Sequence, residues 1–279
     1  MSTIKVKDGD SSDKYFGVFG VGSETFPFQN SFISQGISNA ILEVKNSHGV
    51  DISVQQRAKS LIKFGVNNDI DAGIRETIWS TGGNETYQTS NTIDRVVSSN
   101  AGDTQSVVIE GHTLSGGLLT FVTQTVTLTG TTAVTLATPL ARANRLYNNG
   151  SSDFLGNVTV YVNGGTTHIT ANGAENQSLK GATSISDSEY YLITDLTFSV
   201  NRTNTAVCDF ELQSRIIGKV FRTIAPKLTC SDTEGTIQVH FEQPIIIRNN
   251  SDVRLMCTSS AANTFVSGAM HGYLASIVW

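Results

Sequence analysis

Residues 158–173 read VTVYVNGGTTHITANG, and this short stretch decides the fold class. Every second residue from 158 to 162 is valine and the residues between are polar or amphipathic, which is the period-2 pattern of a half-buried strand. The Asn-Gly-Gly of 163–165 is a turn signal, and 167–170 form a second short run that ends at another Asn-Gly pair. The stretch therefore predicts a β-hairpin.

Similar short runs extend from this hairpin toward both ends of the chain. Residues 121–128 read FVTQTVTL and alternate in their second half. Further apolar or alternating runs lie at 107–109, 192–200, 207–212, 216–224, 237–241, 245–247, 253–256 and 274–278. Turns rich in Asn and Gly separate them, and no helical period alternates with them. So many short strands predict an all-β protein with a β-sandwich or jelly-roll-like architecture.

The composition supports a folded body with a weakly charged surface. Of the 279 residues, 39% are hydrophobic, which is enough for a core, but only 15% are charged, against about 25% in typical soluble domains. A surface poor in Lys and Glu suits a protein whose faces become buried in an assembly. An ordinary β-protein with a neutral polar surface would have the same composition, so both interpretations stay open at this point.

Charge and hydropathy argue against two classes of partner. The net charge is −5 and no basic stretch extends beyond a pair such as Lys5 and Lys7, so we expect no nucleic-acid partner. No run of about 20 apolar residues exists, so we expect no membrane partner either. The N-terminus lacks the apolar region of a secretion signal. Maturation in a reducing cytoplasm is expected, with buried thiols at Cys208, Cys230 and Cys257.

The first 65 residues differ from the rest of the chain. They carry an aromatic segment with scattered glycines, too irregular for a helix and richer in aromatic surface than a segment left in water should be. We therefore expect residues 1–65 to form an extended N-terminal arm with one short helix, and residues 66–279 to form the sandwich body. The predicted partner-binding residues of the arm are Phe16, Phe19, Phe26, Phe28 and Phe32.

The short helix is predicted at about residues 53–64. Ser53 and Gln56 have the spacing of a capping box, in which each residue satisfies a free backbone N–H of the first turn. An apolar stripe follows at i, i+4, i+7 and i+8, formed by Val54, Ala58, Leu61 and Ile62. Gly65 is a plausible C-terminal stop.

No sequence pattern predicts a metal site, a catalytic residue or a cofactor. The five histidines are isolated from one another and from the cysteines, and the His-x-His pattern of cupin barrels is missing. Asp8, Asp10 and Ser12 resemble the start of a calcium loop. However, the sixth position is Asp13 instead of Gly and the twelfth is Phe19 instead of Glu, so a solvated acidic turn is favoured.

Paired carboxylates of the kind used in glycoside hydrolysis could still come from separate strands. The candidates with i, i+2 spacing are Asp187 with Glu189 and Asp209 with Glu211. Cross-strand pairing with Arg215 or Arg222, or simple solvation, is favoured for these acids. We therefore expect the protein not to be an enzyme.

Two stretches of the chain resemble a module of bacteriophage virion proteins, especially those of marine podophages. In these proteins a Trp-x-x-Gly-Gly segment precedes a β-rich run, and the resemblance covers most of residues 74–279. The first stretch comprises Glu76-Thr77-Ile78-Trp79, Gly82-Gly83, residues 94–99, 102–104, 107–111 and 125–130, Arg142-Ala143-Asn144-Arg145 and residues 156–159. The second comprises Pro244-Ile245-Ile246-Ile247 and Ser251-Asp252-Val253-Arg254.

The resemblance implies a jelly-roll-like capsid decoration (cement) protein or another structural protein, often oligomeric, and it implies no catalytic residues. The arm and the helix lie outside it. We accordingly expect a virion structural protein, assembled in the host cytoplasm, that binds the outside of the head shell and stabilises it. Its expected partners are the major capsid protein and copies of itself, as a homotrimer.

Two other classes compete with this interpretation. A receptor-binding or tail-fibre adhesin could share the sandwich fold, because carbohydrate-binding modules do. It would need exposed aromatic platforms, for which the candidates are Trp79, Tyr87, Tyr147, Tyr190 and Tyr191. A sandwich-fold hydrolase is the third class, disfavoured for the reasons given above.

Overall fold

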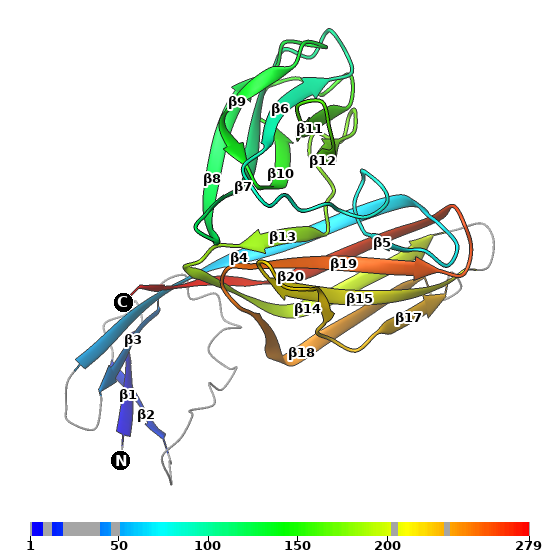
Figure 1. Cartoon of the computed structure of the whole chain (residues 1–279). Helices are drawn as coiled ribbons and strands as arrows, with labels where there is room; N and C mark the ends of the chain where they lie inside the picture. The colour runs from blue at the N-terminus through cyan, green and yellow to red at the C-terminus, as the bar shows by residue number, and fades with distance from the viewer. Residues whose placement is uncertain are drawn as a thin grey trace.

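The computed structural model describes residues 2–7, 13–18, 40–45, 51–201, 206–231 and 235–278, and the side chains among them from residue 59 to residue 276. Every helix or strand in these residues is a β-strand, and all pairings between strands are antiparallel, which confirms the all-β prediction. The chain forms two lobes, one standing on the other (Figure 1). We call residues 51–78 and 181–278 the base lobe and residues 79–180 the inserted lobe.

The described strands of the base lobe and of the segment before it outnumber those of the inserted lobe. They are β1 (Ser2–Lys7), β2 (Asp13–Val18), β3 (Ala40–Lys45), β4 (Asp51–Ile70), β5 (Arg75–Thr77), β13 (Ala182–Ile185), β14 (Glu189–Asn201), β15 (Val207–Ile216), β16 (Arg222–Thr223), β17 (Leu228–Ser231), β18 (Thr236–Ile247), β19 (Ser251–Ser259) and β20 (Thr264–Val278).

Two sheets of the base lobe face each other across one core. The first has the order β18-β14-β20-β4 and continues through β3 and β1 to β2. The second has the order β13-β19-β15-β16, with β17 also on β15 and β5 also on β19. Buried residues from both sheets form a single apolar cluster, in which the rings of Phe198 and Phe210 stack with centroids 4.5 Å apart.

The inserted lobe divides the strand that pairs with one edge of β19 into two short strands, β5 and β13. β5 pairs with Met256–Thr258 and β13 pairs with Ser251–Arg254, so the two short strands lie end to end along β19. At the break, Ile78 N–H donates to Leu255 O at 3.0 Å, and Leu255 N–H donates to Gly181 O at 2.8 Å. Gly181 N–H donates to Ile78 O at 2.9 Å, so the insertion leaves and rejoins the base lobe at adjacent points.

The inserted lobe has two sheets and a core of its own. Its strands are β6 (Ile93–Ser98), β7 (Ser106–Ser115), β8 (Leu118–Thr127), β9 (Val134–Leu140), β10 (Arg142–Asn148), β11 (Val158–Val162) and β12 (Thr167–Ala171). They form the sheets β10-β7-β8 and β12-β11-β6-β9. β11 pairs with β12 in antiparallel register, which confirms the hairpin predicted from residues 158–173.

The helix predicted at residues 53–64 is wrong, because these residues belong to strand β4. β4 pairs with β20 from Gln55↔Val278 to Ile70↔Thr264, and this long-range ladder overrides the local capping pattern. Gly65 is not a helix stop. A Cβ there would lie 2.1 Å from Ile78 O and 2.3 Å from Gly181 N, so only glycine lets β4 pass the point where the insertion joins the base lobe.

Candidate functional site at the junction of the two lobes

The arm residues predicted to bind a partner fall outside what the structure can locate. Phe16 belongs to β2, where only the backbone is described, and Phe19, Phe26, Phe28 and Phe32 lie outside the described residues. The described residues instead bring charged and aromatic side chains together where the inserted lobe meets the base lobe. This junction is the most elaborate polar site among them.

Asp252 of β19 is the centre of the junction. Its carboxylate is fully buried and accepts two hydrogen bonds from Arg142 of β10, at 2.8 Å from Nε and 3.1 Å from Nη2. Arg215 Nε of β15 donates to the same carboxylate at 3.0 Å, and Ser184 Oγ donates to it at 2.7 Å. Only 4% of the Arg142 side chain is exposed, so one buried carboxylate ties the inserted lobe to two strands of the base lobe.

Three arginines and two rings form a cation–π cluster beside Asp252, in which the ring centroids of Tyr87 and Phe221 lie 5.2 Å apart. The guanidinium of Arg142 lies 5.0 Å from the ring centroid of Tyr87, and that of Arg215 lies 4.4 Å from it. Arg215 is also 4.5 Å from Phe221, and Arg254 is 3.8 Å from Phe221. The face of an aromatic ring carries negative charge density and attracts cations. The cation–π cluster holds together the two loops that carry Tyr87 and Phe221.

A bulge in β10 supplies the junction with backbone acceptors. The register with β7 shifts between Ala143 and Arg145, which leaves Asn144 out of the ladder. Asn144 O accepts a hydrogen bond from Lys63 Nζ at 2.7 Å, and Ala143 O accepts one from Lys180 Nζ at 2.7 Å. Two lysines of the segments flanking the junction therefore hold the same bulge.

Lys180 also anchors the Trp-x-x-Gly-Gly segment, residues 79–83, which is part of the resemblance to phage virion proteins. Its ammonium forms an ion pair with Glu85 at 2.5 Å and lies 5.4 Å from the ring centroid of Trp79. Trp79 Nε1 donates to Gly83 O at 3.0 Å, and Gly83 adopts a φ of +64° that favours glycine. The motif thus closes a tight turn at the start of the insertion, which is a structural role.

Two histidines at the junction are held neutral. His112 is buried between Asn144, whose amide donates to Nδ1 at 2.9 Å, and the Ser186 hydroxyl, 3.2 Å from Nε2. Burial lowers the pKa of His112 to about 4. Burial and the nearby Lys180 lower the pKa of His168 to about 4 as well. Near neutral pH, both rings serve as uncharged hydrogen-bonding groups.

The carboxylates considered for hydrolysis are not brought together as a catalytic pair. Glu211 is buried and accepts hydrogen bonds from Thr223 and Gln213. Its Oε1 also forms an ion pair with Lys227 Nζ at 2.8 Å. Burial alone would raise the pKa of Glu211, but these partners hold it at about 2. Asp209 accepts a hydrogen bond from Thr229 instead. Arg215, one of the two arginines considered as a cross-strand partner for these acids, binds Asp252 instead.

Neither a metal site nor a membrane-spanning helix is found among the described residues. Across the described residues, no group of three or more His, Cys, Asp or Glu side chains is arranged to hold a metal ion. The same residues include no helix long and apolar enough to cross a membrane.

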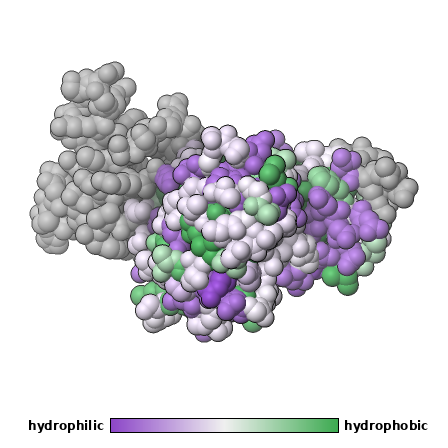
Figure 2. Space-filling view, turned by 90° about the horizontal axis from the view of Figure 1, so that it is seen from above, coloured by the Kyte–Doolittle hydropathy of each residue, from purple (hydrophilic) through white to green (hydrophobic). Residues whose placement is uncertain are grey.

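The aromatic residues considered as a sugar platform do not form one. Trp79 and Tyr191 are buried, and the ring of Tyr87 contacts Arg142, Arg215 and Phe221. Tyr147 and Tyr190 are half-buried on separate strands, β10 and β14. On the face seen from above, small hydrophobic areas are interspersed with hydrophilic and neutral ones (Figure 2). Exposed apolar side chains are present on both lobes, for example Phe64, Phe121 and Ile246.

The junction was not found by sequence reasoning. Arg142 and Asp252 are separated by 110 positions, and nothing local to either residue announces the pair. Both lie in stretches that carry the resemblance to phage virion proteins, Arg142-Ala143-Asn144-Arg145 and Ser251-Asp252-Val253-Arg254. Their shared presence in the stretches that carry the resemblance is the one sequence signal that could have suggested pairing Arg142 with Asp252.

Comparison with known proteins identifies no family for the chain. No protein-family model matches the chain, and no curated protein matches it. Two solved structures are weakly similar, one of the VP2 subviral particle of infectious bursal disease virus and one of the Gt strain of the same virus. Both are 10% identical, with TM-scores of 0.19 and 0.17. They cover 79% and 81% of this chain and 72% of each matched chain. At these scores neither likeness carries an argument about fold or function.

Proposed function

We propose that the protein is a non-enzymatic structural component of a virus particle, most specifically a capsid decoration (cement) protein of a bacteriophage. The observation that carries the proposal is the strand order of the base lobe. The order β18-β14-β20-β4 and the order β13-β19-β15, with β16 and β17 both on β15, support a jelly-roll arrangement of two facing sheets in which β5 and β13 share one strand position. Jelly rolls are a recurrent architecture of viral capsid domains.

Two further features support a particle-bound role. The resemblance of residues 74–279 to podophage virion proteins is independent of the strand order. The junction fastens the inserted lobe onto the base lobe through the buried Asp252 cluster. Such a body presents two rigid modules while the surface stays poor in charge, which suits burial against neighbouring subunits. The proposed site of action is the outside of the head shell.

The proposed partners are the major capsid protein and two further copies of this chain. In this proposal residues 1–50 anchor the protein through Phe16, Phe19, Phe26, Phe28 and Phe32. Each buried Phe contributes roughly 1.5–3 kcal/mol relative to exposure, so several together would outweigh the ordering of the segment.

Binding to capsids tests the proposal directly. The full chain should co-sediment with purified expanded capsids of its own phage, and a chain lacking residues 1–50 should not. A truncated chain that binds equally well would move the contact to the base or inserted lobe. A full chain that never binds would refute the cement role.

Mass photometry at micromolar concentration tests the oligomer. We expect a species of three times the 29.9 kDa chain. A monomer in solution and on the particle would refute the trimer.

A receptor-binding adhesin remains the second candidate, since lectin domains also use jelly rolls. The aromatic candidates in the sequence do not support it, because Trp79 and Tyr191 are buried. A glycan array separates the two roles. Saccharide binding by a chain that does not bind capsids would favour the adhesin.

A further inference from the structure

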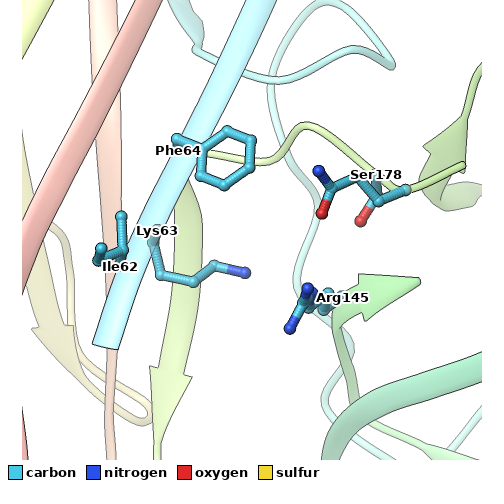
Figure 3. A pocket seen from close by; sticks show the side chains of 6 residues that line it. Ile62, Lys63, Phe64, Arg145 and Ser178 are labelled. Carbon is cyan, nitrogen blue, oxygen red and sulfur yellow. The ribbon is translucent and has the colours of Figure 1, made fainter. Parts of the chain in front are cut away.

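A small cavity lies between β4 and the inserted lobe. Its volume is about 240 Å³, and three segments line it: Ile62, Lys63 and Phe64 of β4, Arg145 of β10, and Gln177 and Ser178 ahead of β13. Figure 3 shows Lys63 reaching from β4 into the space that Arg145 borders from the other side. Among the described strands, the edge of β4 on which β3 pairs is covered only from Asp51 to Gln56.

Lys63 is an unusual residue to find in such a place. Its side chain is only 8% exposed, and its ammonium has three donor hydrogens. The described residues provide one hydrogen-bond acceptor, Asn144 O at 2.7 Å, and no carboxylate within ion-pair distance. A buried charge without a counter-charge is destabilising, so this position calls for an explanation.

The charges around Lys63 make the cavity attractive to anions. Burial, Lys180 and Arg145 lower the pKa of Lys63 to about 7, and Glu110 and Glu85 act in the opposite direction. Glu85 is already engaged by Lys180 in an ion pair at 2.5 Å. An anion entering the cavity would meet Lys63 and the exposed Arg145 and would relieve their mutual repulsion.

We propose that this cavity binds a small carboxylate, which Lys63 and Arg145 hold while Ile62 and Phe64 contact the carbon skeleton of the ligand. A guanidinium pairs with a carboxylate through two parallel hydrogen bonds, and the ammonium adds a third. The apolar side chains of Ile62 and Phe64 suit an acid with a carbon skeleton better than inorganic phosphate. Ile62 and Phe64 are 51% and 39% exposed, which leaves apolar surface available at the mouth.

The volume limits the size of the ligand. Sites for drug-sized ligands span roughly 300–1,000 Å³, so this cavity fits one small acid or one acidic sugar residue. The shared chemistry is a carboxylate on a compact body. The acid can be a uronic-acid type of sugar or a short alkyl carboxylate. The inference does not rest on the proposed virion role, because it follows from the cavity alone.

Calorimetric titration of the full chain with sodium glucuronate, sodium hexanoate, glucose and inorganic phosphate tests the proposal. We expect one or both carboxylates to bind and glucose not to bind. Lys63→Met removes the charge and keeps the chain length, and Arg145→Gln removes the guanidinium. Each should weaken binding about ten-fold or more, as expected for loss of a charged hydrogen bond. Lys59→Met, an exposed lysine on the same strand that does not line the cavity, should leave the affinity unchanged.

The pH dependence separates binding by Lys63 from a purely structural effect. A bound carboxylate favours the charged ammonium, so binding at pH 8 should be accompanied by proton uptake, and the affinity should fall as the pH rises through 7. Binding of glucuronate alone would assign the site to acidic sugars, and binding of hexanoate would assign it to alkyl acids. Unchanged binding in Lys63→Met, tighter binding of phosphate, or no binding of either carboxylate at millimolar concentration would overturn the proposal.

Discussion

The base lobe and the inserted lobe are built around separate cores of different composition. The base-lobe core contains the stacked rings of Phe198 and Phe210, together with Tyr191 and three cysteines. The inserted-lobe core is aliphatic except for Phe154. The two clusters share no residue. Between them lie buried charged side chains, so ion pairs and hydrogen bonds contribute much of what fixes the position of one lobe on the other.

In this protein, different interactions stabilise each lobe and fix the orientation of one lobe on the other, two tasks that one core usually performs together. Apolar burial is not directional, so each core can stabilise its own lobe without setting the orientation of the other. Hydrogen bonds to a buried carboxylate have defined directions, and an error in orientation would leave a charge unpaired. The inserted lobe is therefore expected to hold one orientation, although each lobe has its own core.

Removal of the Asp252 carboxylate should have the largest effect. Asp252→Ala leaves Arg142 and Arg215 without their shared partner, and breaking a buried pair in this way costs about 3–5 kcal/mol. We expect chemical denaturation to become less cooperative, because the lobes lose their common fastening. Asp209→Ala, which removes an acid bonded to Thr229 at an exposed position of the same sheet, should cost less than about 1 kcal/mol. Equal effects of the two variants would show that the ion pair does not fasten the lobes.

A matched pair of core substitutions tests whether the two cores are independent. Leu212→Ala in the base lobe and Leu146→Ala in the inserted lobe each remove a fully buried side chain, at an expected cost of about 2–5 kcal/mol. Hydrogen exchange should speed up mainly in the lobe that carries the substitution. Faster exchange to the same extent in both lobes, for either variant, would mean that they unfold as one unit.

Substitution of Gly65 tests the passage of β4 past the start of the insertion. In Gly65→Ala the new Cβ would meet Ile78 O and Gly181 N, and overpacking of this kind costs about 1–3 kcal/mol. Gly165→Ala in the inserted lobe is the control, since its nearest neighbour would be 3.6 Å away. If Gly65→Ala were as stable as Gly165→Ala, the close approach of β4 to Ile78 and Gly181 would be contradicted.

Acid should weaken the junction before it weakens the base-lobe core. His112 and His168 have a folded pKa of about 4, below the unfolded value of about 6.5. The unfolded chain therefore binds more protons in this range, and stability falls as the pH decreases from 6.5 to 4, by on the order of 1.4 kcal/mol per pKa unit at each fully buried ring. Imidazole resonances in a two-dimensional NMR titration should show both midpoints near 4. A midpoint near 6.5 for His112 would contradict its burial between Asn144 and Ser186.

The sequence was informative where the structure is local. The hairpin of residues 158–173 needs only its own alternation and its Asn-Gly turn, and both were visible. The helix at 53–64 failed because β4 owes its conformation to β20, whose residues lie about 200 positions away. A period-2 signal was present as well: Ile62, Phe64 and Val66 alternate with Lys63 and Gly65, and the capping pattern obscured it.

The insertion could not be foreseen in the same way. Ile78 and Gly181 bond to each other and to Leu255, which is distant in sequence, and no local pattern in the chain marks either residue as a boundary. The junction between the lobes could not be foreseen for the same reason. Arg142, Lys180 and Asp252 lie in separate elements, and their pairing depends on how the inserted lobe folds and docks.

The adjacency of Ile78 and Gly181 gives the base lobe the properties of a host for foreign modules. Because these residues hydrogen-bond to each other, a guest domain with closely spaced termini could be grafted in place of residues 79–180 without a linker, provided that it replaces the partner that Arg142 gives to the buried Asp252. The host strand would be completed on either side of the graft by β5 and β13, which keep their pairing with β19. One body could in this way carry interchangeable modules while the strand pairing of its own sheets stays the same.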